Sequence, residues 1–588
     1  MVIFTKIDKI DYICTNYGCK LKISYMKRHL SLLSILLCLV VCLPIQANGR
    51  FNVKDFGAKG DGVHIDSPAI NAAIDAASEA GGGTVYFPAG TYSSYSIRLK
   101  SHISLYLDHG AVLKAAVPNE QNHYDLPEEN WSTYQDFGHS HWKNSLIWGI
   151  GLHDITIQGF GLIDGSEGIT RGQAKMNGFP AANKAIALKE CRNVTIRDIS
   201  MLLCGHFAML LTGVDNLTID NVRCDTNRDA FDIDCCANVR VSNCYVNTLN
   251  DDAIVLKCSY GLGYAKATEN VTITNCQVSG YDPGTLLDGT FKKTITQAPD
   301  RDGPTGRIKF GTESNGGFKN ITISNCVFDN CRGIALETVD GAIIEDITVD
   351  NIAMRDIWNS PIYIRLGNRA RGPKELPVSV VRRVKLSNIV VKNADCRYAS
   401  ILFGLEGHPI EDVTLSNIYI QYKGGLTMDD VIHQRGANPF FTRVNSAAHG
   451  TRQSGDEQEP EKPGRPDPFN VPDMEKGYPE PSSHGILPAY GLFIKHAKNV
   501  RVDKVEFETL QEDQRPAIVL MNVDGIKFTE VEVDKSAEAP YFVLKNVRNF
   551  QVEDFVGVKD KNITSAENQE IINKCFCISL LFYKQPFN

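Results

Sequence analysis

A short repeated motif constrains this chain more than any other feature. An opening residue, usually Asn or Asp, is followed by apolar residues one and three positions later, which is the period of a half-buried β-strand. Two clear copies, NLTI from Asn216 and NVRV from Asn238, begin 22 residues apart. The other copies open at Asp154, Asn193, Asn270, Asn320, Asp346, Arg383, Asp412, Asn499 and Gly525. Strands repeated in this way predict a solenoid, in which each coil packs on the next.

A second column of residues predicts how each coil turns. Asn stands five positions after the opener at Asn221, Asn243, Asn275, Asn325, Asn351, Asn388 and Asn417. Asn tolerates the left-handed αL conformation and can hydrogen-bond its own backbone, so it suits a tight turn. Copies separated by 22 to 26 residues fit one coil, and larger gaps indicate loop insertions. We therefore predict an all-β fold, a right-handed parallel β-helix.

The segment before the regular coils contains one amphipathic stretch. Ser67 followed by Pro68 suits a helix N-cap with proline at the first helical position. One face then carries an apolar stripe made of Ile70, Ala73, Ile74 and Ala77. A solenoid must cover its open end, so we predict a short N-terminal capping helix that ends at Gly81–Gly83.

One domain accounts for most of the length. We expect a single β-helix over residues 48–560, with loop insertions at 279–305 and 427–490. Residues 561–588 lose the repeat and stay unassigned.

Residues 1–47 are interpreted as an export signal. A Lys-Arg pair precedes an apolar run from Leu30 to Leu43, and a small-residue cleavage site ends at Ala47. The run is short for a bilayer span, so we expect a signal peptide, no membrane span and an exported protein, periplasmic or secreted. The methionine directly before the pair indicates that residues 1–25 are an over-extended start. A lipid anchor stays an alternative.

The charge composition bears on which partners the protein can bind. Its formal net charge of −8 gives no indication of the basic surface that nucleic-acid binding requires. We expect a monomer with no nucleic-acid partner.

The cysteines follow the repeat. Of the 17 cysteines, Cys244, Cys276 and Cys326 each stand six residues after a motif opener. Ile or Val occupies the same position in other coils, so the position points inward. We predict buried free thiols there rather than disulfides, and no cysteine spacing indicates zinc.

Acidic residues follow two neighbouring copies of the motif. Asp229 and Asp251 each stand 13 residues after an opener, and Asp252 is adjacent. Equivalent positions of stacked coils lie about 4.8 Å apart. Carboxylates crowded in this way repel one another, which costs stability unless a function requires it.

These acids carry a family resemblance. Asn227-Arg-Asp229, followed by Asp251-Asp252 and Lys257, resembles the acidic constellation of family-28 glycoside hydrolases, the polygalacturonase group. The resemblance implies hydrolysis of pectin-type polysaccharides with inversion and without a cofactor or metal. Asp251 would be the general acid, and Asp229 with Asp252 would activate water. An inverting pair is expected to be about 6.5–9.5 Å apart.

The chain departs from the family at two sugar-binding motifs. Thr305-Gly306-Arg307 replaces the family's Gly-His-Gly, and Ala335-Leu-Glu337 replaces its Arg-Ile-Lys. An acceptor such as Glu337 suits hydroxyls and repels a carboxylate, so we expect a neutral or mixed-linkage substrate to be preferred. Candidate substrate-binding residues are Lys257, His206, Arg307, Lys309, Glu337 and Arg365. His206 stands 13 residues after Asn193 and is expected one coil below Asp229, where a structural role in the turn is the alternative.

Two other functions stay open. A calcium-dependent polysaccharide lyase would use the carboxylates as Ca²⁺ ligands. A non-catalytic β-helix would bind glycans without turnover. For the hydrolase, both insertions follow the acidic coils and could close one end of a groove, which predicts exo action.

Overall fold

The computed structural model describes residues 49–129, 134–135, 137–172, 174–296, 303–437 and 464–572. The chain divides into two units, residues 1–50 and 51–588, and the β-helix belongs to the second. The expected signal peptide lies outside the described residues, as do the end of the tail and part of the second insertion. Within the described part of the chain, no helix combines the length and the apolar character needed to cross a membrane.

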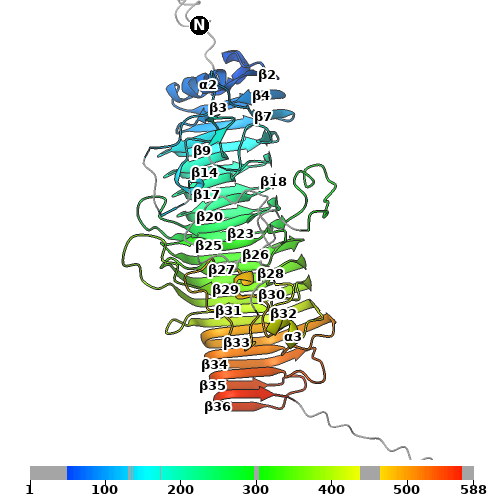
Figure 1. Cartoon of the computed structure of the whole chain (residues 1–588). Coiled ribbons are helices and arrows are strands. Elements are labelled where there is room, and N and C mark those ends of the chain that lie inside the picture. Colours follow the sequence, from blue (N-terminus) through cyan, green and yellow to red (C-terminus); the bar gives the residue numbers. More distant parts are fainter. Residues whose placement is uncertain are drawn as a thin grey trace, which may run out of the picture. The chain divides into compact units, whose positions relative to one another are not determined.

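Successive coils contribute parallel strands to three stacks (Figure 1). Stack 1 contains β5 (Ile97–Arg98), β8 (Ile147–Ile150), β13 (Lys184–Lys189), β16 (Phe207–Thr212), β19 (Asp229–Asp234), β22 (Ile254–Cys258), β25 (Ile308–Ser314), β27 (Ile334–Thr338), β29 (Ile362–Leu366) and β31 (Ser400–Phe403). Stack 2 contains β3 (Gly83–Phe87), β6 (Ile103–Leu107), β9 (His153–Gly159), β14 (Arg192–Arg197), β17 (Asp215–Asp220), β20 (Ala237–Ser242) and β23 (Thr268–Thr274). Stack 3 contains β2 (Asp61–Ile65), β4 (Gly90–Ser94), β7 (Ala111–Ala115), β10 (Leu162–Asp164), β15 (Ser200–Leu202), β18 (Arg223–Thr226), β21 (Tyr245–Thr248) and β24 (Gln277–Ser279).

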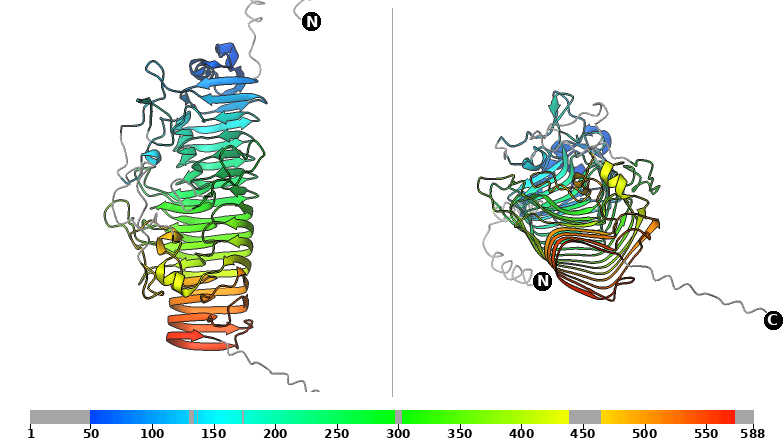
Figure 2. Two further views of the ribbon diagram at one scale, coloured as in Figure 1. Left: turned by 45° about the vertical axis from the view of Figure 1, so that its right-hand side comes forward. Right: turned by 60° about the horizontal axis from the view of Figure 1, so that its bottom comes forward.

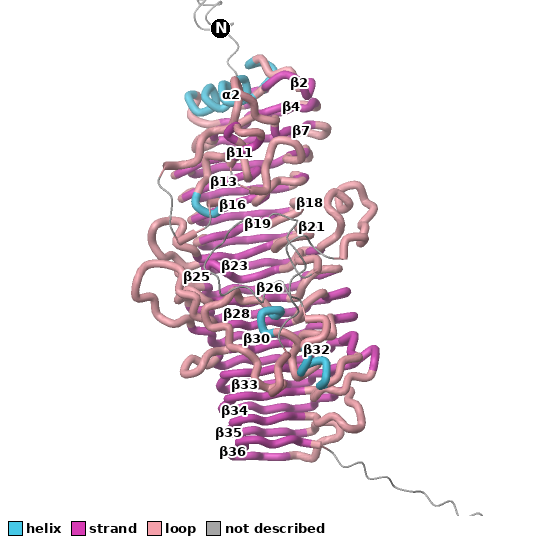
Figure 3. Tube along the Cα trace, viewed as in Figure 1, coloured by secondary structure: helices cyan, strands magenta, loops and turns pink. Residues whose placement is uncertain are grey.

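Longer strands continue these stacks toward the C-terminus. Stacks 2 and 3 merge in β26 (Phe318–Asp329), β28 (Ile343–Ile357), β30 (Val380–Ala394) and β32 (Ile410–Gly424). Stack 1 joins them in β33 (Leu492–Gln511), β34 (Ile518–Val533) and β35 (Phe542–Glu553). The remaining elements are β1 (Arg50–Asn52), β11 (Lys175–Met176), β12 (Phe179–Pro180), η2 (Val53–Phe56), η3 (Gly138–Ser140), α3 (Met428–His433) and η5 (Pro481–His484). Strands dominate the described chain (Figure 3), which confirms the parallel β-helix prediction.

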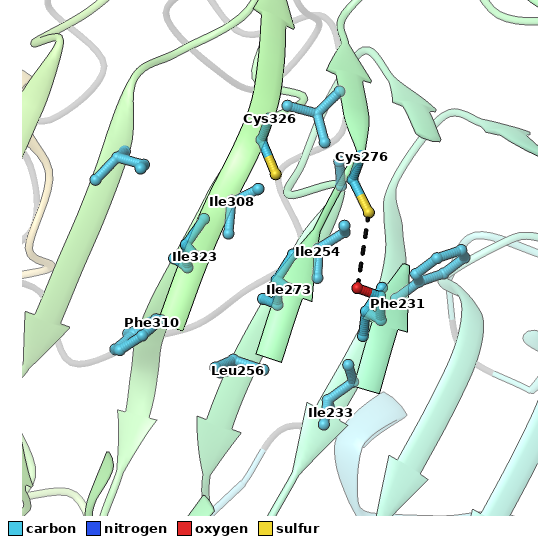
Figure 4. Packing of buried hydrophobic residues seen from close by; sticks show 14 of the residues in the cluster. Phe231, Ile233, Ile254, Leu256, Ile273, Cys276, Ile308, Phe310, Ile323 and Cys326 are labelled. Carbon is cyan, nitrogen blue, oxygen red and sulfur yellow. Dashed lines mark hydrogen bonds between the residues drawn. The ribbon is translucent and has the colours of Figure 1, made fainter. Parts of the chain in front are cut away.

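The inward side chains form one continuous apolar core. Figure 4 shows Phe231, Ile254 and Ile308 of successive coils packed beside Cys276 and Cys326. Cys244, Cys276 and Cys326 are at most 2% exposed and are free thiols. Cys326 pairs in register with Ile352, as the shared inward column requires. The buried-thiol prediction is therefore confirmed.

Asn residues form the predicted turns. Every Asn in the predicted column has a positive φ, from 53° to 57°. Amide groups also bond from coil to coil, for example from Asn351 Nδ2 to Asn325 Oδ1 at 2.7 Å. The opening residues adopt the same conformation, with φ 55° at Asn216 and 57° at Asn238. Each coil therefore has a second αL corner, at the residue where the repeat predicts only the start of a strand.

Both ends of the coil stack are covered. The helix α2 (Ser67–Glu79) buries Ile70 and the rest of the predicted stripe, although Asp66 rather than Ser67 is its N-cap. At the other end, β36 (Lys561–Ile571) pairs antiparallel with β35. The tail left unassigned by the sequence thus begins with a strand, which closes the edge of the parallel stack.

The described parts of the two insertions cover different stacks. Figure 2 shows loops gathered along one side of the strands. Residues 464–490 pack on stack 1, where Val471 and Leu487 join an apolar cluster with Tyr363. Residues 279–296 lie against stack 3, where the backbone N–H of Leu286 donates to Asp225 Oδ2 at 2.9 Å. Among the described residues of the two insertions, those at 464–490 lie on stack 1, which carries the acids.

Candidate active site

Three carboxylates meet on two successive coils of stack 1. Asp229 begins β19, while Asp251 and Asp252 precede β22. One oxygen of each lies within 4.8 Å of the others, and each residue is at most 6% exposed. The Asp252 backbone N–H is 3.2 Å from both Asp229 Oδ1 and Asp251 Oδ1. The predicted clustering of the acids is what the structure shows.

The predicted alignment within this cluster is wrong by one residue. β16 and β19 pair Phe207 with Asp229, an offset of 22 residues. β19 and β22 pair Asp232 with Val255, an offset of 23. The turn before Asp252 contains one more residue than the turn before Asp229, so Asp252 rather than Asp251 continues the Asp229 position. Equal spacing in sequence did not mean equal position in the coil.

His206 consequently lies against Arg228 and not below Asp229. Its Nδ1 is 2.9 Å from the carbonyl oxygen of Arg171. Arg228 Nη1 lies 2.5 Å from Nδ1 and 2.6 Å from Nε2 of the same ring. Arg228 Nε lies 3.4 Å from Asp251 Oδ2. The histidine therefore reaches the acidic cluster through an arginine.

The separation of the carboxylates also differs from the expectation. Oxygens within 4.8 Å of one another leave less room than the roughly 6.5–9.5 Å of an inverting pair with water between acid and base. The cluster is therefore tighter than predicted from the sequence for an inverting pair.

The cluster retains a proton more readily than an isolated carboxylate. Burial and the charge of Asp251 raise the pKa of Asp229 well above its usual value. Lys257 and Arg228 oppose this increase without cancelling it. Asp229 therefore holds a proton to higher pH than a solvated aspartate does.

On the C-terminal side of the cluster, cations are buried by the later insertion. Arg307 Nε lies 2.9 Å from Asp252 Oδ1, and its Nη2 lies 2.5 Å from Glu480 Oε1. Lys309 Nζ is 3.4 Å from both Asp252 Oδ2 and Glu337 Oε2. Burial raises the pKa of Glu337 to about 8, although Lys309 and Arg307 act in the opposite direction. These side chains form an internal ion network.

That network corrects the predicted sugar subsite. Glu337 is 0% exposed, and Arg307 and Lys309 are 2% exposed. Ala335 is buried in the apolar cluster that contains Val471 of the insertion. Glu337 at this position faces Lys309 and Arg307 instead of standing as an unpaired acceptor, so the premise of the neutral-substrate prediction is not met, and the substrate preference stays a prediction.

Arg365 is likewise not placed to meet a sugar. It is 1% exposed, and its guanidinium donates to the carbonyl oxygens of Gly404 at 3.3 Å and Met474 at 3.2 Å. Burial lowers its pKa. The side chain attaches the insertion to β29 instead.

Lys257 is embedded in a second ion network. Its Nζ lies 2.8 Å from Asp232 and 3.3 Å from Glu313, and 3.9 Å from Asp229. His139, from the loop before β8, completes the group with Nε2 at 3.4 Å from Asp232. Burial opposes its charge, but Asp232 raises the pKa of His139 to about 9. The sequence carried no signal for His139, because no repeat places that loop.

The carboxylate oxygens of the acidic cluster are ligands that would suit a hard cation such as Ca²⁺. The positively charged side chains around the cluster make the site less suitable for such a cation. Asp252 is already paired with Arg307 and Lys309, and Asp251 with Arg228. A divalent cation placed there would have to displace these positive charges or tolerate their repulsion.

Comparisons with known proteins agree with the fold. Residues 140–297 match the family model for a right handed beta helix region, and residues 50–123 match that for rhamnogalacturonase A/epimerase, pectate lyase-like. The structure of Yersinia enterocolitica family 28 exopolygalacturonase superposes with a TM-score of 0.55 at 16% identity, over 82% of this chain and 78% of that one. The chain is a right-handed parallel β-helix protein.

Sequence relatives narrow this class. A probable polygalacturonase of Vitis vinifera is 24% identical over 63% of this chain and 74% of its own length. Plasmin and fibronectin-binding protein A of Streptococcus pneumoniae is 32% identical over 42% of this chain, but only 34% of the relative's length is covered. Alginate lyase 7 of Azotobacter vinelandii is 33% identical over 31% of this chain and 20% of its own length. Within the β-helix class, the chain has the polygalacturonase-like fold of family-28 glycoside hydrolases.

Proposed function

We propose that this protein is a glycoside hydrolase that cleaves pectin-type polysaccharides. The observation that carries the proposal is the meeting of Asp229, Asp251 and Asp252 on consecutive coils. Neighbouring carboxyl groups that can serve as proton donor and as base are what general acid–base hydrolysis of a glycosidic bond requires. Relatives named as polygalacturonases support the same chemistry.

The roles follow from position and from the family resemblance. Asp251 is the most exposed of the three at 6% and protonates the leaving oxygen. Asp229 and Asp252 hold and deprotonate water on the other face of the sugar, which gives inversion. Anomeric analysis of the first product by NMR tests this assignment, and a retained configuration contradicts it.

We further propose exo action. Residues 464–490 cover stack 1 at β25, β27 and β29, directly on the C-terminal side of the acids. A groove closed on one side accepts a chain end and releases one short product. An early digest of polygalacturonate should therefore contain that product alone, whereas a ladder of intermediate oligomers contradicts exo action.

Asp251→Asn tests the function. We expect activity on pectic oligosaccharides to fall by roughly 10²–10⁴-fold, the usual contribution of a general acid, with an unchanged unfolding midpoint. The matched control is Asp288→Asn, on an exposed turn of the first insertion. Near-normal turnover by Asp251→Asn contradicts the assignment.

The lyase stays the second candidate, because alginate lyase 7 matches part of the chain. A lyase leaves an unsaturated product that absorbs in the ultraviolet, and a calcium-dependent one loses activity with chelator. Product spectra therefore separate the two reactions. A non-catalytic binder gives neither product.

A further inference from the structure

The αL corner at which stack 2 begins in each coil carries different residues near the N-terminal end of the β-helix. Asn occupies this corner in successive coils at Asn193 and Asn216. In the two coils before them the corner residues are Asp154, with φ 57°, and His102, with φ 64°. The register of β6 and β9 extends to these two residues, because the His102 backbone N–H donates to the carbonyl oxygen of His153. His102 and Asp154 are therefore neighbours in one column.

A second histidine joins this pair. His153 directly precedes Asp154, and its Nδ1 lies 2.8 Å from Asp154 Oδ2. His102 Nδ1 lies 3.4 Å from the same oxygen. The centroids of the two imidazole rings are 4.7 Å apart, and the rings are inclined at 84°. One ring nitrogen of each histidine and one carboxylate oxygen lie within 4.8 Å of one another, so two imidazoles and a carboxylate can bind a single ion.

The carboxylate of this group is oriented from the next coil. Asn193 Nδ2 donates to Asp154 Oδ1 at 2.8 Å, and Asn216 Nδ2 donates in turn to Asn193 Oδ1 at 2.9 Å. The second oxygen, Oδ2, is the one that faces the histidines. The backbone of His153 is fixed as well, because its N–H donates to Ser101 Oγ at 3.1 Å. Outer hydrogen bonds that orient a ligand are typical of metal sites in proteins.

The type and spacing of these groups suit a divalent transition metal. Imidazole and carboxylate together are ligands of Zn²⁺, whereas Ca²⁺ and Mg²⁺ take oxygen ligands. Ligand atoms about 2.0–2.1 Å from a tetrahedral Zn²⁺ lie about 3.3 Å from one another. The distance from His102 Nδ1 to Asp154 Oδ2 already matches this value. The distance from His153 Nδ1 to the same oxygen has to widen by about 0.5 Å.

We propose that His102, His153 and Asp154 form a Zn²⁺ site that joins two coils near the N-terminal end of the β-helix. Each histidine binds through Nδ1 as a neutral imidazole with its proton on Nε2, and water takes the fourth position, since the side chain of His102 is 53% exposed. The role of the site is structural, because the cation holds β6 against β9 and stabilises the folded state to which it binds. The site lies on stack 2, whereas the acids lie on stack 1, so the proposal is independent of the proposed function.

Calorimetric titration of chelator-treated protein with ZnCl₂ tests the site. His102→Asn and Asp154→Asn place the residue type of the later coils at the same αL corner, so both variants should fold. Loss of an outer hydrogen bond typically weakens metal binding by roughly 10–100-fold. Loss of a ligand in either variant, or in His153→Ala, should therefore weaken Zn²⁺ binding by at least about 100-fold.

The matched control is His64→Asn. His64 is an exposed histidine whose Nδ1 lies 2.6 Å from Asp61 Oδ2. This pair belongs to no potential ligand group of three among the described residues. The control variant should bind Zn²⁺ with the affinity of wild type.

Hydrogen exchange followed by mass spectrometry tests the structural role. Added Zn²⁺ should slow exchange in residues 102–107 and 153–159 of wild-type protein and should leave the same residues of His102→Asn unchanged. Equal exchange of these strands in wild type with and without Zn²⁺ overturns the structural role.

The site itself is overturned if wild-type protein binds no Zn²⁺, or if folded His102→Asn or Asp154→Asn binds it as tightly as wild type. Zn²⁺ bound at the acids of stack 1 instead would give the second of these results, because none of the three substitutions touches those acids.

Discussion

Replacement of Glu480 tests how the later insertion is held. Glu480 is 2% exposed, and its carboxylate lies 2.5 Å from Arg307 Nη2 and 3.1 Å from Arg332 Nη1. Glu480→Gln keeps the shape of the side chain and removes its charge. Arg332, which is 0% exposed, then loses a carboxylate in a place that water does not reach. Breaking one partner of a buried ion pair typically costs about 3–5 kcal/mol.

That cost should appear in the insertion rather than in the coils. Residues 464–490 contact stack 1 through side-chain and backbone groups, such as His484 Nε2 at 3.1 Å from the Tyr363 hydroxyl. The coils themselves are held by backbone ladders that the substitution leaves intact. A factor of ten corresponds to about 1.4 kcal/mol. The open population of the insertion should therefore increase by about two to three and a half orders of magnitude.

Limited proteolysis measures this population, because cleavage follows the fraction of open molecules when opening is fast. We expect thermolysin to cut Glu480→Gln within residues 465–490 at least about 100-fold faster than wild type. Glu406→Gln, in an exposed turn, serves as the control and should match wild type. Equal cleavage rates for Glu480→Gln and wild type would refute the argument that this ion pair closes the insertion.

Three other outcomes are expected. Cys244, Cys276 and Cys326 should resist thiol reagents in native protein and react in denaturant, because each is at most 2% exposed; rapid native labelling contradicts the inward column. Chelator should leave activity on pectic oligosaccharides unchanged, and a loss restored by Ca²⁺ would favour the lyase. Burial raises the pKa of Glu337 to about 8, above the roughly 4.3 of an unfolded glutamate. Between these pH values the folded state binds one more proton at Glu337 than the unfolded state does. The stability of the folded state therefore falls as pH rises from about 4.3 to about 8. Glu337→Gln should remove that fall, measured as urea midpoints at pH 5 and pH 8, and identical pH dependence in both proteins would contradict it.

Most of the fold could be predicted from the repeat, because the same residue types adopt the same local conformation in each coil. An Asn at a fixed position adopts αL wherever the coil turns, as Asn221 and Asn417 do. A residue such as Cys276 can be assigned to the interior because Ile or Val replaces it in other coils. These inferences need no knowledge of distant contacts, and so they were accessible from the sequence.

The site was less predictable for two physical reasons. A turn longer by one residue shifted Asp252, rather than Asp251, into line with Asp229, and turn length is not visible in the strand pattern. The second reason is that residues far apart in sequence cover stack 1. Glu480 lies 173 residues beyond its partner Arg307, and no periodicity relates them. The exposure of Arg307 could therefore not be judged from its strand alone.

Burial of these cations changes what the substrate can be. If Lys309 and Glu337 lined an open subsite, a glutamate in place of a lysine would repel an acidic sugar. In the folded chain Lys309 lies 3.4 Å from Glu337, whose pKa burial raises to about 8, so Glu337 presents no exposed carboxylate to a substrate. The replacement of the family's Arg-Ile-Lys motif by Ala335-Leu-Glu337 therefore gives no reason by itself to exclude an acidic sugar.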